Sequence, residues 1–439
     1  MRPGLCAWLL LIGTAALRAQ PAPPTSPPPI APPAVLAAPE LVPVVETPPL
    51  PFGATHEALA YPYLGWLKME ALLWWVKDGP LPEPLLTTGP VGEPDVAVLG
   101  TPGTRIVIGA EDQDYGTFFG GRWTWGTWFD PSRKCGLEVR GFTLERRAVL
   151  LNAESDATGS PILARPFIDA TTGQERRAFV TFPNDFVGGL GVTLSDHLWG
   201  IETNLLVNVL AGGVPRQARQ CPWGEWRLGL LAGVRYLDLC EDLTIQQVTR
   251  LIGARVANFG GTVVTRPSIL FLSDGFAARN QFYGGQVGGQ LEWAHGALAV
   301  ELLGKLAIGG CHETLKITGA TGLDRFPGFT SLQTLEGALL ASPTNIGRQG
   351  TERFCFVPEL GATVGWQCSS HVRLSAGYSF MYWSRVVRPG DQMDRTVDLS
   401  RLPINPNPNA PLGPERPARR FVESDYWAQG LHFGFEVRY

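Results

Sequence analysis

The last nine residues, LHFGFEVRY, alternate strictly between large apolar side chains and polar or small ones. Leu431, Phe433, Phe435, Val437 and Tyr439 form the apolar set. This period of two predicts a β-strand with one wholly apolar face. Chain termini tend to fray, so a soluble domain seldom ends on such a strand. In an outer-membrane barrel the closing strand turns its apolar face to lipid and its polar face to the lumen, which favours a barrel. Phe435 and Tyr439 are then the expected C-terminal signal for the barrel-assembly machinery.

Composition agrees with a sheet in contact with lipid. Charged residues make up 17% of the 439-residue chain, below the roughly 25% usual for soluble domains, while Gly and Trp are plentiful at 52 and 14. The net charge of −4 provides no basic stripe, which excludes nucleic acid as a partner. The length would allow two or three soluble domains, but a barrel with long loops reaches it as one unit.

The first 60 residues predict export followed by a spacer. Residues 1–20 join an early Arg2 to an apolar run, Ala7 to Leu17, and a small-residue exit near Ala19, which is typical of a secretory signal peptide. Residues 21–60 are rich in Pro and Ala, a composition that favours extended polyproline II without a core. We interpret them as a disordered periplasmic spacer; the alternative is a tether to peptidoglycan. The barrel is expected over 61–439.

The remaining chain alternates with period two in about twelve segments. No segment has 18 apolar residues free of charge, so helical membrane spans are not expected. The strands are expected near 63–77, 115–129, 135–148, 184–195, 198–210, 225–238, 241–250, 280–294, 297–309, 353–367, 371–386 and 428–439. Long connections at 78–114, 149–183, 211–224, 251–279, 310–352 and 387–427 alternate with short ones at 130–134, 195–197, 240, 294–296 and 368–371. This alternation predicts an all-β, up-and-down antiparallel transmembrane barrel with short periplasmic turns and long outer loops.

The two faces of these strands differ in charge. The face assigned to lipid carries none, as in Leu67, Met69, Ala71, Leu73 and Trp75 of the first strand. The opposite face carries both signs and supplies the candidate pore-lining residues: Lys68, Glu70, Arg122, Glu138, Arg140, Glu202, Arg227, Arg235, Glu292, Glu301, Lys305, Glu359, Arg373, Arg385, Glu436 and Arg438. Buried ions need water or partners. We therefore expect a lumen in which acids and bases pair, with a pore that is narrow or plugged by a loop.

Three segments carry a family resemblance. They are WLKMEALLWWVKDGPLP (66–82), YSFMYWSRVVRPGDQMDRTV (378–397) and YWAQGLHFGFEVRY (426–439). From residue 61 to its end the chain resembles the seventh family of outer-membrane β-barrel porins, known mainly from planctomycete bacteria. The resemblance implies an outer-membrane barrel and, by name only, a porin role, with no catalytic or substrate-binding residues to transfer.

The run RPGDQMDR is the most specific of these motifs. It contains Arg388, Pro389, Gly390, Asp391, Gln392, Asp394 and Arg395, directly after the eleventh expected strand. Pro389 and Gly390 suit a turn that Asp391 can cap, and Arg388 or Arg395 can pair with an acid. The motif either pins the base of a loop, which we favour, or folds a loop back into the mouth.

The sequence gives little indication of a catalytic site or a metal site. His197, His295 and His371 are expected in short turns, His56 in the leader, His312 in a loop and His432 in the lumen, with no Ser or Asp placed to form a nucleophilic pair. We expect no enzyme. Cys311, His312 and Glu313 are consecutive and cannot easily surround one tetrahedral metal, so neither a metal nor a cofactor is expected. Six cysteines follow the leader, and Cys311 and Cys355 bracket one loop as a candidate disulfide.

The leading functional hypothesis is a porin-like passive channel for small hydrophilic solutes. The alternative is a closed barrel that acts as a surface scaffold or adhesin, because paired lumen charges fit both. A soluble periplasmic β-sandwich is a third hypothesis.

Overall fold

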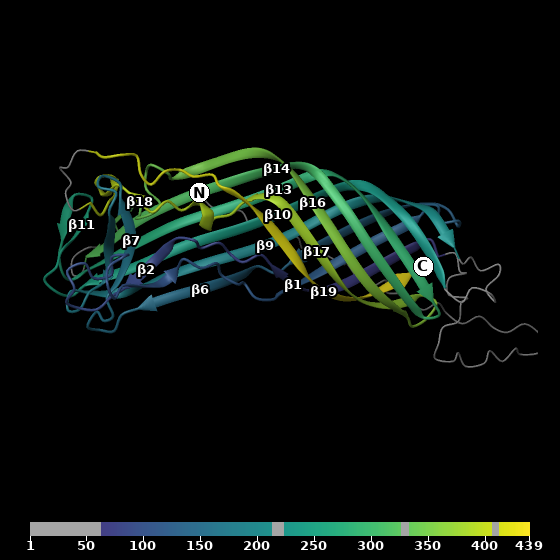
Figure 1. The fold of residues 1–439 in the computed structure, drawn as a ribbon, viewed down its shortest axis with the longest axis horizontal. Coiled ribbons are helices and arrows are strands. Elements are labelled where there is room, and N and C mark those ends of the chain that lie inside the picture. Colours follow the sequence, from purple (N-terminus) through teal and green to yellow (C-terminus); the bar gives the residue numbers. More distant parts are fainter. Residues whose placement is uncertain (1–62, 213–223, 326–332, 406–411) are drawn as a thin grey trace, which may run out of the picture. The chain divides into compact units, whose positions relative to one another are not determined.

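A computed structural model describes residues 63–212, 224–325, 333–405 and 412–439. Ten antiparallel strands form a closed ring in the order β10-β13-β14-β16-β17-β19-β1-β4-β5-β9, and β9 pairs back to β10 (Figure 1). The strands are β1 Gly65–Val76, β4 Phe118–Trp128, β5 Cys135–Leu144, β9 Phe186–Gly212, β10 Glu225–Leu251, β13 Ser268–His295, β14 Leu298–Arg325, β16 Gly347–Gln367, β17 Val372–Val387 and β19 Glu423–Arg438. The prediction of an up-and-down β-barrel is confirmed.

The first and last strands, β1 and β19, pair with each other and close the ring. Trp66 pairs with Arg438 and Val76 with Ala428, and Gly65 and Tyr439 exchange two backbone hydrogen bonds of 2.9 Å. We call this edge of the barrel, which also holds the connections near 130–134, 296–297 and 368–371, the short-turn end. The opposite edge is the loop end. No helix among the described residues is long and apolar enough to cross a bilayer.

The expected number of about twelve strands is wrong, because two expected turns are strand interior. Residues 195–197 lie inside β9 and Cys240 inside β10, where Cys240 pairs directly with His197. Polar residues at and beside these positions have partners elsewhere. Asp196 accepts from the Tyr426 hydroxyl at 3.1 Å, and Glu241, next to Cys240, binds Arg388. His197 is therefore not in a turn. As a consequence, the strand ends on either side of the expected outer loop 211–224 lie at the short-turn end, where Trp226 pairs with Gly212.

Several strands are longer than expected. β13 begins at Ser268, β14 continues to Arg325 and β16 begins at Gly347, so the expected loops 251–279 and 310–352 are partly strand, and His312 lies in β14. A bilayer needs only about 9–11 residues per strand. A 28-residue strand such as β14 extends over roughly 90 Å. These strands therefore continue well beyond the lipid.

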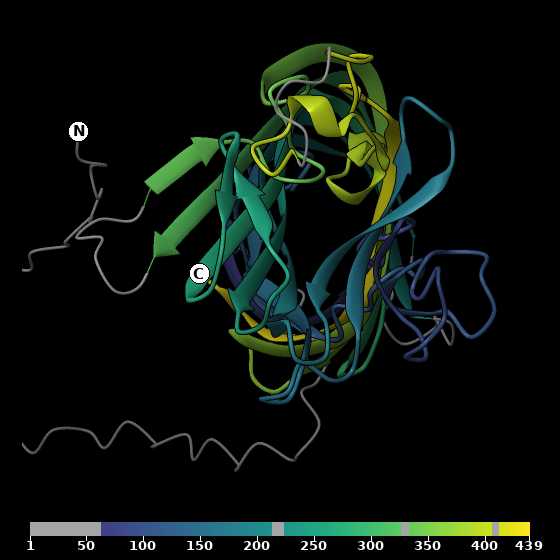
Figure 2. The same cartoon turned by 90° about the vertical axis from the view of Figure 1, so that its left-hand side faces the viewer.

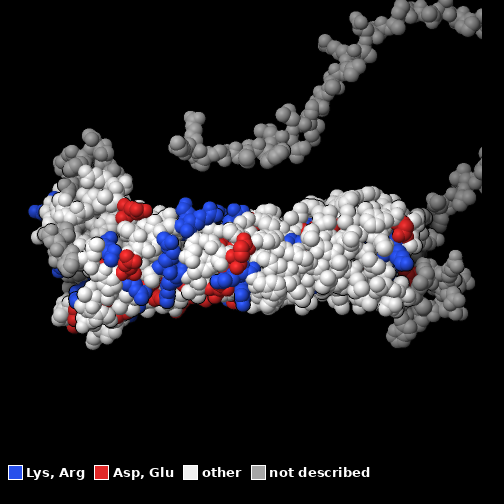
Figure 3. All heavy atoms as spheres, turned by 90° about the horizontal axis from the view of Figure 1, so that it is seen from above, with Lys and Arg blue, Asp and Glu red and all other residues white. Residues whose placement is uncertain are grey.

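The outer surface shows where the lipid lies. Near the short-turn end it is almost free of charge, and Figure 3 shows this pale belt beside a zone rich in Lys and Arg. On β14, Leu302, Leu306 and Ile308 are exposed within the belt, and Lys316 is exposed in the charged zone. Exposed aromatic residues mark both edges of the belt, as membrane interfaces favour: Trp125, Trp226, Trp366 and Tyr439 at one edge, and Phe119, Tyr283 and Phe354 at the other.

The long connections fold together at the loop end (Figure 2). A five-stranded sheet joins β2 Pro84–Thr88, β3 Arg105–Gly109, β7 Leu163–Asp169, β8 Glu175–Thr181 and β18 Thr396–Val397. Two 3-10 helices, η3 Gly390–Gln392 and η4 Leu399–Arg401, flank β18. The smaller strands are β6 Arg147–Glu154, which pairs with β9, the hairpin β11 Ala257–Phe259 and β12 Thr262–Val264, and β15 Gln333–Glu336 on β14. We call the loop-end segments 77–117, 388–405 and 412–422 the plug.

Candidate functional site in the barrel interior

The interior begins at the short-turn end with a charged vestibule. It is a cavity of about 100 Å³ whose lining includes Lys68, Glu138, Arg227, Glu301 and Glu436. Arg373 binds Glu292 at 3.0 Å, and Arg438 lies 3.8 Å from the same carboxylate. Strand alternation delivers all these side chains to one face, so the charges that lipid excludes collect inside.

Above the vestibule an ion-pair network crosses the lumen. Lys305 Nζ on β14 lies 2.7 Å from Glu202 on β9 and 3.1 Å from Glu359 on β16. Arg235 on β10 binds the same two acids, with Glu202 at 3.6 Å. Arg140 on β5 reaches Glu359 at 3.9 Å, although β5 and β16 stand on opposite sides of the ten-stranded ring. Side chains therefore bridge the whole width of the barrel at this level.

A second cluster completes the layer. Arg122 on β4 forms two hydrogen bonds of 2.6 and 3.0 Å to Glu70 on β1, and it donates to Ser379 on β17 at 3.2 Å. Lys68 lies 2.9 Å from Glu70, and His432 lies 3.6 Å from it. His432 is therefore inside the barrel, as expected. Every carboxylate in the layer has a cationic neighbour, which is the condition for keeping such groups out of water.

The candidate pore-lining residues lie inside the barrel, with one exception. All of them except Arg385 are buried or half-buried on inward-facing strand positions. Arg385 is exposed near the loop end of β17, 4.0 Å from Glu423. The interior set is thus assembled as a paired network, and Arg385 stands apart from it.

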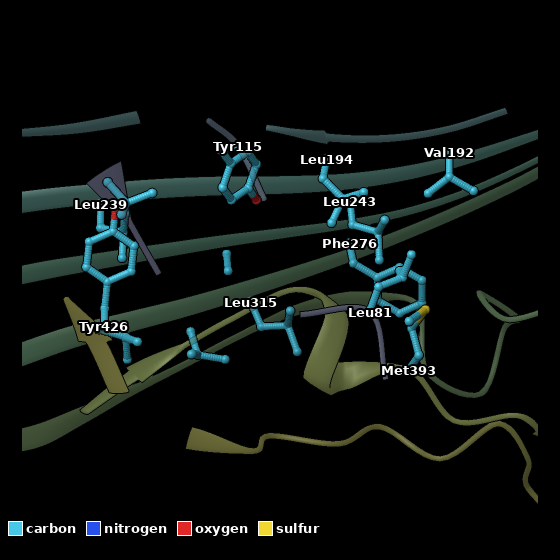
Figure 4. Close-up of a cluster of buried hydrophobic side chains, with 14 of the residues drawn as sticks. Leu81, Tyr115, Val192, Leu194, Leu239, Leu243, Phe276, Leu315, Met393 and Tyr426 are labelled. Atoms are coloured by element: carbon cyan, nitrogen blue, oxygen red, sulfur yellow. The ribbon is translucent and has the colours of Figure 1, made fainter. Parts of the chain in front are cut away.

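Beyond the network the interior is apolar. Leu72, Leu198, Leu237, Phe282 and Trp383 are at most 1% exposed. Figure 4 shows the next layer, where Leu239, Leu243, Phe276 and Leu315 of the barrel wall face Leu81, Tyr115 and Met393 of the plug. Sequence reasoning missed this apolar fill, although Leu81, Leu85 and Leu86 are unusual in a connection expected to be solvated.

The RPGDQMDR motif fastens the plug. Arg388 donates to both oxygens of Glu241, at 2.6 Å in the shortest contact, and to the carbonyl oxygen of Asp78 at 2.7 Å. Gly390 packs against Pro80 so closely that a Cβ would overlap the Pro80 carbonyl. Pro389 precedes η3, whose residues include Asp391, with no side-chain cap. The motif both pins the loop base and holds the plug in the mouth.

The second half of the motif ties the plug segments to one another. Gln392 exchanges two hydrogen bonds with Val422, at 2.8 and 2.9 Å. Arg395 lies 2.9 Å from Glu83 and 3.0 Å from Glu175. Burial alone would raise the pKa of Asp394, but backbone N–H groups of Ala418 and Thr396 and the Arg416 guanidinium bind its carboxylate and lower that pKa. These contacts connect β18 to segments far apart in the sequence.

The remaining predicted residues fall in three places. Phe435 and Tyr439 face outward, 45% and 58% exposed, and the Trp125 indole donates to the Tyr439 hydroxyl at 2.9 Å. Cys311 and Cys355 are buried free thiols inside β14 and β16, the strands on either side of the connection they were expected to close, and they form no disulfide. The leader, the spacer, His56 and Cys221 lie outside the described residues.

Comparisons with known proteins agree with this architecture at the level of the family. Three solved structures with some similarity are the outer membrane protease OmpT of Escherichia coli, a Pseudomonas aeruginosa FadL homologue and the Pseudomonas putida toluene transporter TodX. OmpT is 9% identical, with 86% of this chain and 97% of that chain covered and a TM-score of 0.38. The FadL homologue is 8% identical (87% and 93% covered, TM-score 0.21), and TodX is 8% identical (87% and 92% covered, TM-score 0.14). At these scores none of the three informs the substrate or activity of this chain.

The family assignment rests on the sequence itself. No curated protein matches the chain. The family model described as "Putative beta barrel porin-7 (BBP7)" matches residues 66–439, from the second residue of β1 to the C-terminal Tyr439. The chain therefore belongs to this β-barrel porin family.

Proposed function

We propose that this chain acts as a closed outer-membrane barrel, a scaffold that carries a rigid folded surface at its loop end. The observation that carries the proposal is the network in which Arg140 of β5 and Glu359 of β16 meet across the lumen at 3.9 Å. The plug adds an apolar layer above it.

The energetics support closure. A hydrated solute would have to separate buried ion pairs, and breaking one such pair costs about 3–5 kcal/mol. It would then have to cross the apolar layer around Leu237 and Phe282, where polar groups find no partners. A solute would thus meet a charged barrier and then an apolar one, and both favour a barrel that is closed in its most stable state.

A solute-permeation assay tests this proposal. Full-length protein is reconstituted into liposomes, and swelling is recorded in isotonic solutions of small sugars and amino acids. We expect rates equal to those of protein-free liposomes. Swelling that falls with solute size would favour the passive channel for small hydrophilic solutes.

That channel is the second candidate, and one observation favours it. The vestibule at the short-turn end is charged and open enough to hold water, as the entrance of a hydrophilic path would be. Passage would then require the plug to leave the mouth. A disulfide engineered between plug and wall would abolish swelling in this case, and would change nothing in a closed scaffold.

The placement of the barrel in the cell completes the proposal. We infer that the short-turn end faces the periplasm, that the spacer 21–60 lies there with peptidoglycan as a candidate contact, and that β19 engages the assembly machinery. Protease added to intact cells should then cleave only at the loop end. Cleavage at short turns such as 368–371 would contradict this orientation.

A further inference from the structure

Three side chains with metal-binding atoms meet inside the barrel above the lipid belt. Cys311 and Glu313 lie on β14, Cys355 lies on β16, and all three are 0% exposed. The two sulfur atoms and a Glu313 oxygen lie within 4.8 Å of one another. The group stands apart from the ion-pair network, closer to the loop end.

The Glu313 carboxylate lacks a hydrogen-bond donor among the described residues. Neither of its carboxylate oxygens receives a hydrogen bond, although both are inaccessible to solvent. Other interior acids, such as Glu70 and Glu241, bind a guanidinium through two hydrogen bonds. A buried carboxylate without hydrogen bonds is costly, so its position beside two thiols points to a cation.

We propose that Cys311, Cys355 and Glu313 bind a zinc ion. Two thiolate sulfurs and one carboxylate oxygen are a donor set that suits Zn²⁺, and a water molecule can take the fourth tetrahedral position. Zinc bonds of about 2.3 Å to sulfur and about 2.0–2.2 Å to oxygen would place the ligand atoms roughly 3.5–3.8 Å apart. Rotating the three side chains so that their ligand atoms move by about 1 Å brings these atoms to that spacing.

The surroundings suit the charge of such a site. Three anionic ligands around Zn²⁺ leave one negative charge. A groove in the barrel wall is lined by Arg353, Ser384, Arg385, Glu423, Ser424 and Asp425, and Cys355 Sγ lies 3.6 Å from the carbonyl oxygen of Arg385. The groove therefore carries two guanidinium groups, on Arg353 and Arg385, close to the proposed anionic site.

Strand register favours a metal over the candidate disulfide. Cys311 pairs with Arg353, and Cys355 pairs with Gly309, so the cysteines are diagonal neighbours. Diagonal positions on antiparallel strands lie about 7–8 Å apart, whereas a disulfide needs Cα atoms within roughly 6.8 Å. A metal bridges the wider gap without moving the backbone.

Sequence reasoning expected no metal because Cys311, His312 and Glu313 are consecutive. Strand alternation separates them: Cys311 and Glu313 point inward, while His312 points outward, 2.7 Å from Glu352. The third ligand, Cys355, comes from β16, which pairs with β14. The expected strand 297–309 ended before Cys311, so the sequence pattern did not place Cys311 and Glu313 on the wall beside Cys355.

Metal titration of the folded, full-length protein in detergent tests the proposal. We expect one equivalent of Zn²⁺ per chain, and with Co²⁺ alone a thiolate-to-cobalt charge-transfer absorption. Cys311→Ser and Cys355→Ser should each lose the charge-transfer absorption. Their affinity for Zn²⁺ should fall by more than the roughly 10- to 100-fold that is typical when a residue hydrogen-bonded to a metal ligand is replaced. Glu313→Gln should weaken binding and keep the thiolate bands.

Cys240→Ser is the matched control, because Cys240 is a thiol on the same barrel that contacts Asp238 instead. It should bind Zn²⁺ and Co²⁺ as the wild type does. Heat-modifiable gel migration confirms that each variant is folded. For variants that do not fold, the X-ray absorption spectrum of the zinc-loaded wild type gives the same answer, because two sulfur neighbours at about 2.3 Å identify a site with two thiolates.

Three outcomes would overturn the proposal. They are an absence of Zn²⁺ binding in folded protein, loss of the cobalt absorption in Cys240→Ser, and a Cys311–Cys355 disulfide in protein isolated without reductant. None of these measurements depends on whether the barrel conducts.

Discussion

Lys305 on β14 donates to both carboxylate oxygens of Glu202 on β9, at 2.7 and 3.0 Å, across a part of the ring where β13 and β10 intervene. Such a contact requires a barrel narrow enough for two side chains to span the lumen. Ten strands provide that width, since barrel diameter grows with strand number. The interior charges therefore act first as a structural network.

Replacing Lys305 with Met should destabilise the barrel. Glu202 and Glu359 would stay buried with less positive charge around them, and removing one partner of a buried pair costs about 3 kcal/mol or more. Lys316→Met is the control, because Lys316 is exposed on the same strand. Guanidinium unfolding in detergent measures the difference, and equal midpoints for the two variants would refute the structural role of the network.

Arg388→Gln should loosen the plug and leave the barrel intact. The variant leaves Glu241 unpaired and removes the donor to the Asp78 carbonyl. We expect protease cleavage within 388–422 with heat-modifiable migration unchanged. Arg348→Gln, at an exposed position of β16, should resist protease like the wild type. Resistance of Arg388→Gln would show that the plug is held by other contacts.

The lipid belt predicts a position-dependent cost for a new charge. Phe433 is 47% exposed in the middle of β19. An arginine at the bilayer midplane of a barrel costs about 2–4 kcal/mol, so Phe433→Arg should lower the yield of folded protein in lipid vesicles. Thr318→Arg places the same charge on β14 in the charged zone and should fold normally. Similar yields of folded protein for the two variants would contradict the position assigned to the lipid belt on the barrel.

Plug stability should depend on pH through Asp394. Its pKa is lowered in the folded protein, despite burial, by hydrogen bonds from Ala418, Thr396 and Arg416. The carboxylate therefore contributes stability that is complete above its unfolded pKa of about 3.9 and is lost as pH falls through the lower folded pKa. Amide hydrogen exchange around residues 394–418 should accelerate in that window, after correction for intrinsic rates. Asp394→Asn should show faster exchange near neutral pH and lose the acid transition, and a wild-type profile in this variant would contradict the role of Asp394.

The sequence predicted the barrel because lipid imposes a simple pattern on it. Within the belt the apolar residues face outward, as at Leu431, Phe433 and Phe435, and this alternation is visible without a structure. Beyond the belt the pattern inverts. On β14, Leu315 and Ile317 are buried inside, while Lys316 is exposed.

That inversion explains the errors in the expected strands. The predicted strands were those with apolar residues on the outer face. That pattern stops where water replaces lipid, so the predicted strands corresponding to β13, β14 and β16 are shorter than the observed ones. Polar residues at 195–197 suggested a turn because the partner of Asp196, the Tyr426 hydroxyl, comes from a distant segment. The inward direction of the charges followed from alternation, but their pairing across the lumen depends on the number of strands.

Single-channel recording in planar lipid bilayers tests the closed barrel most directly. We predict that folded full-length protein inserts without stepwise conductance, and that a variant combining Arg388→Gln with Lys305→Met conducts, because both the plug and the network are weakened. Stable, reproducible conductance steps from the wild-type protein would contradict the account.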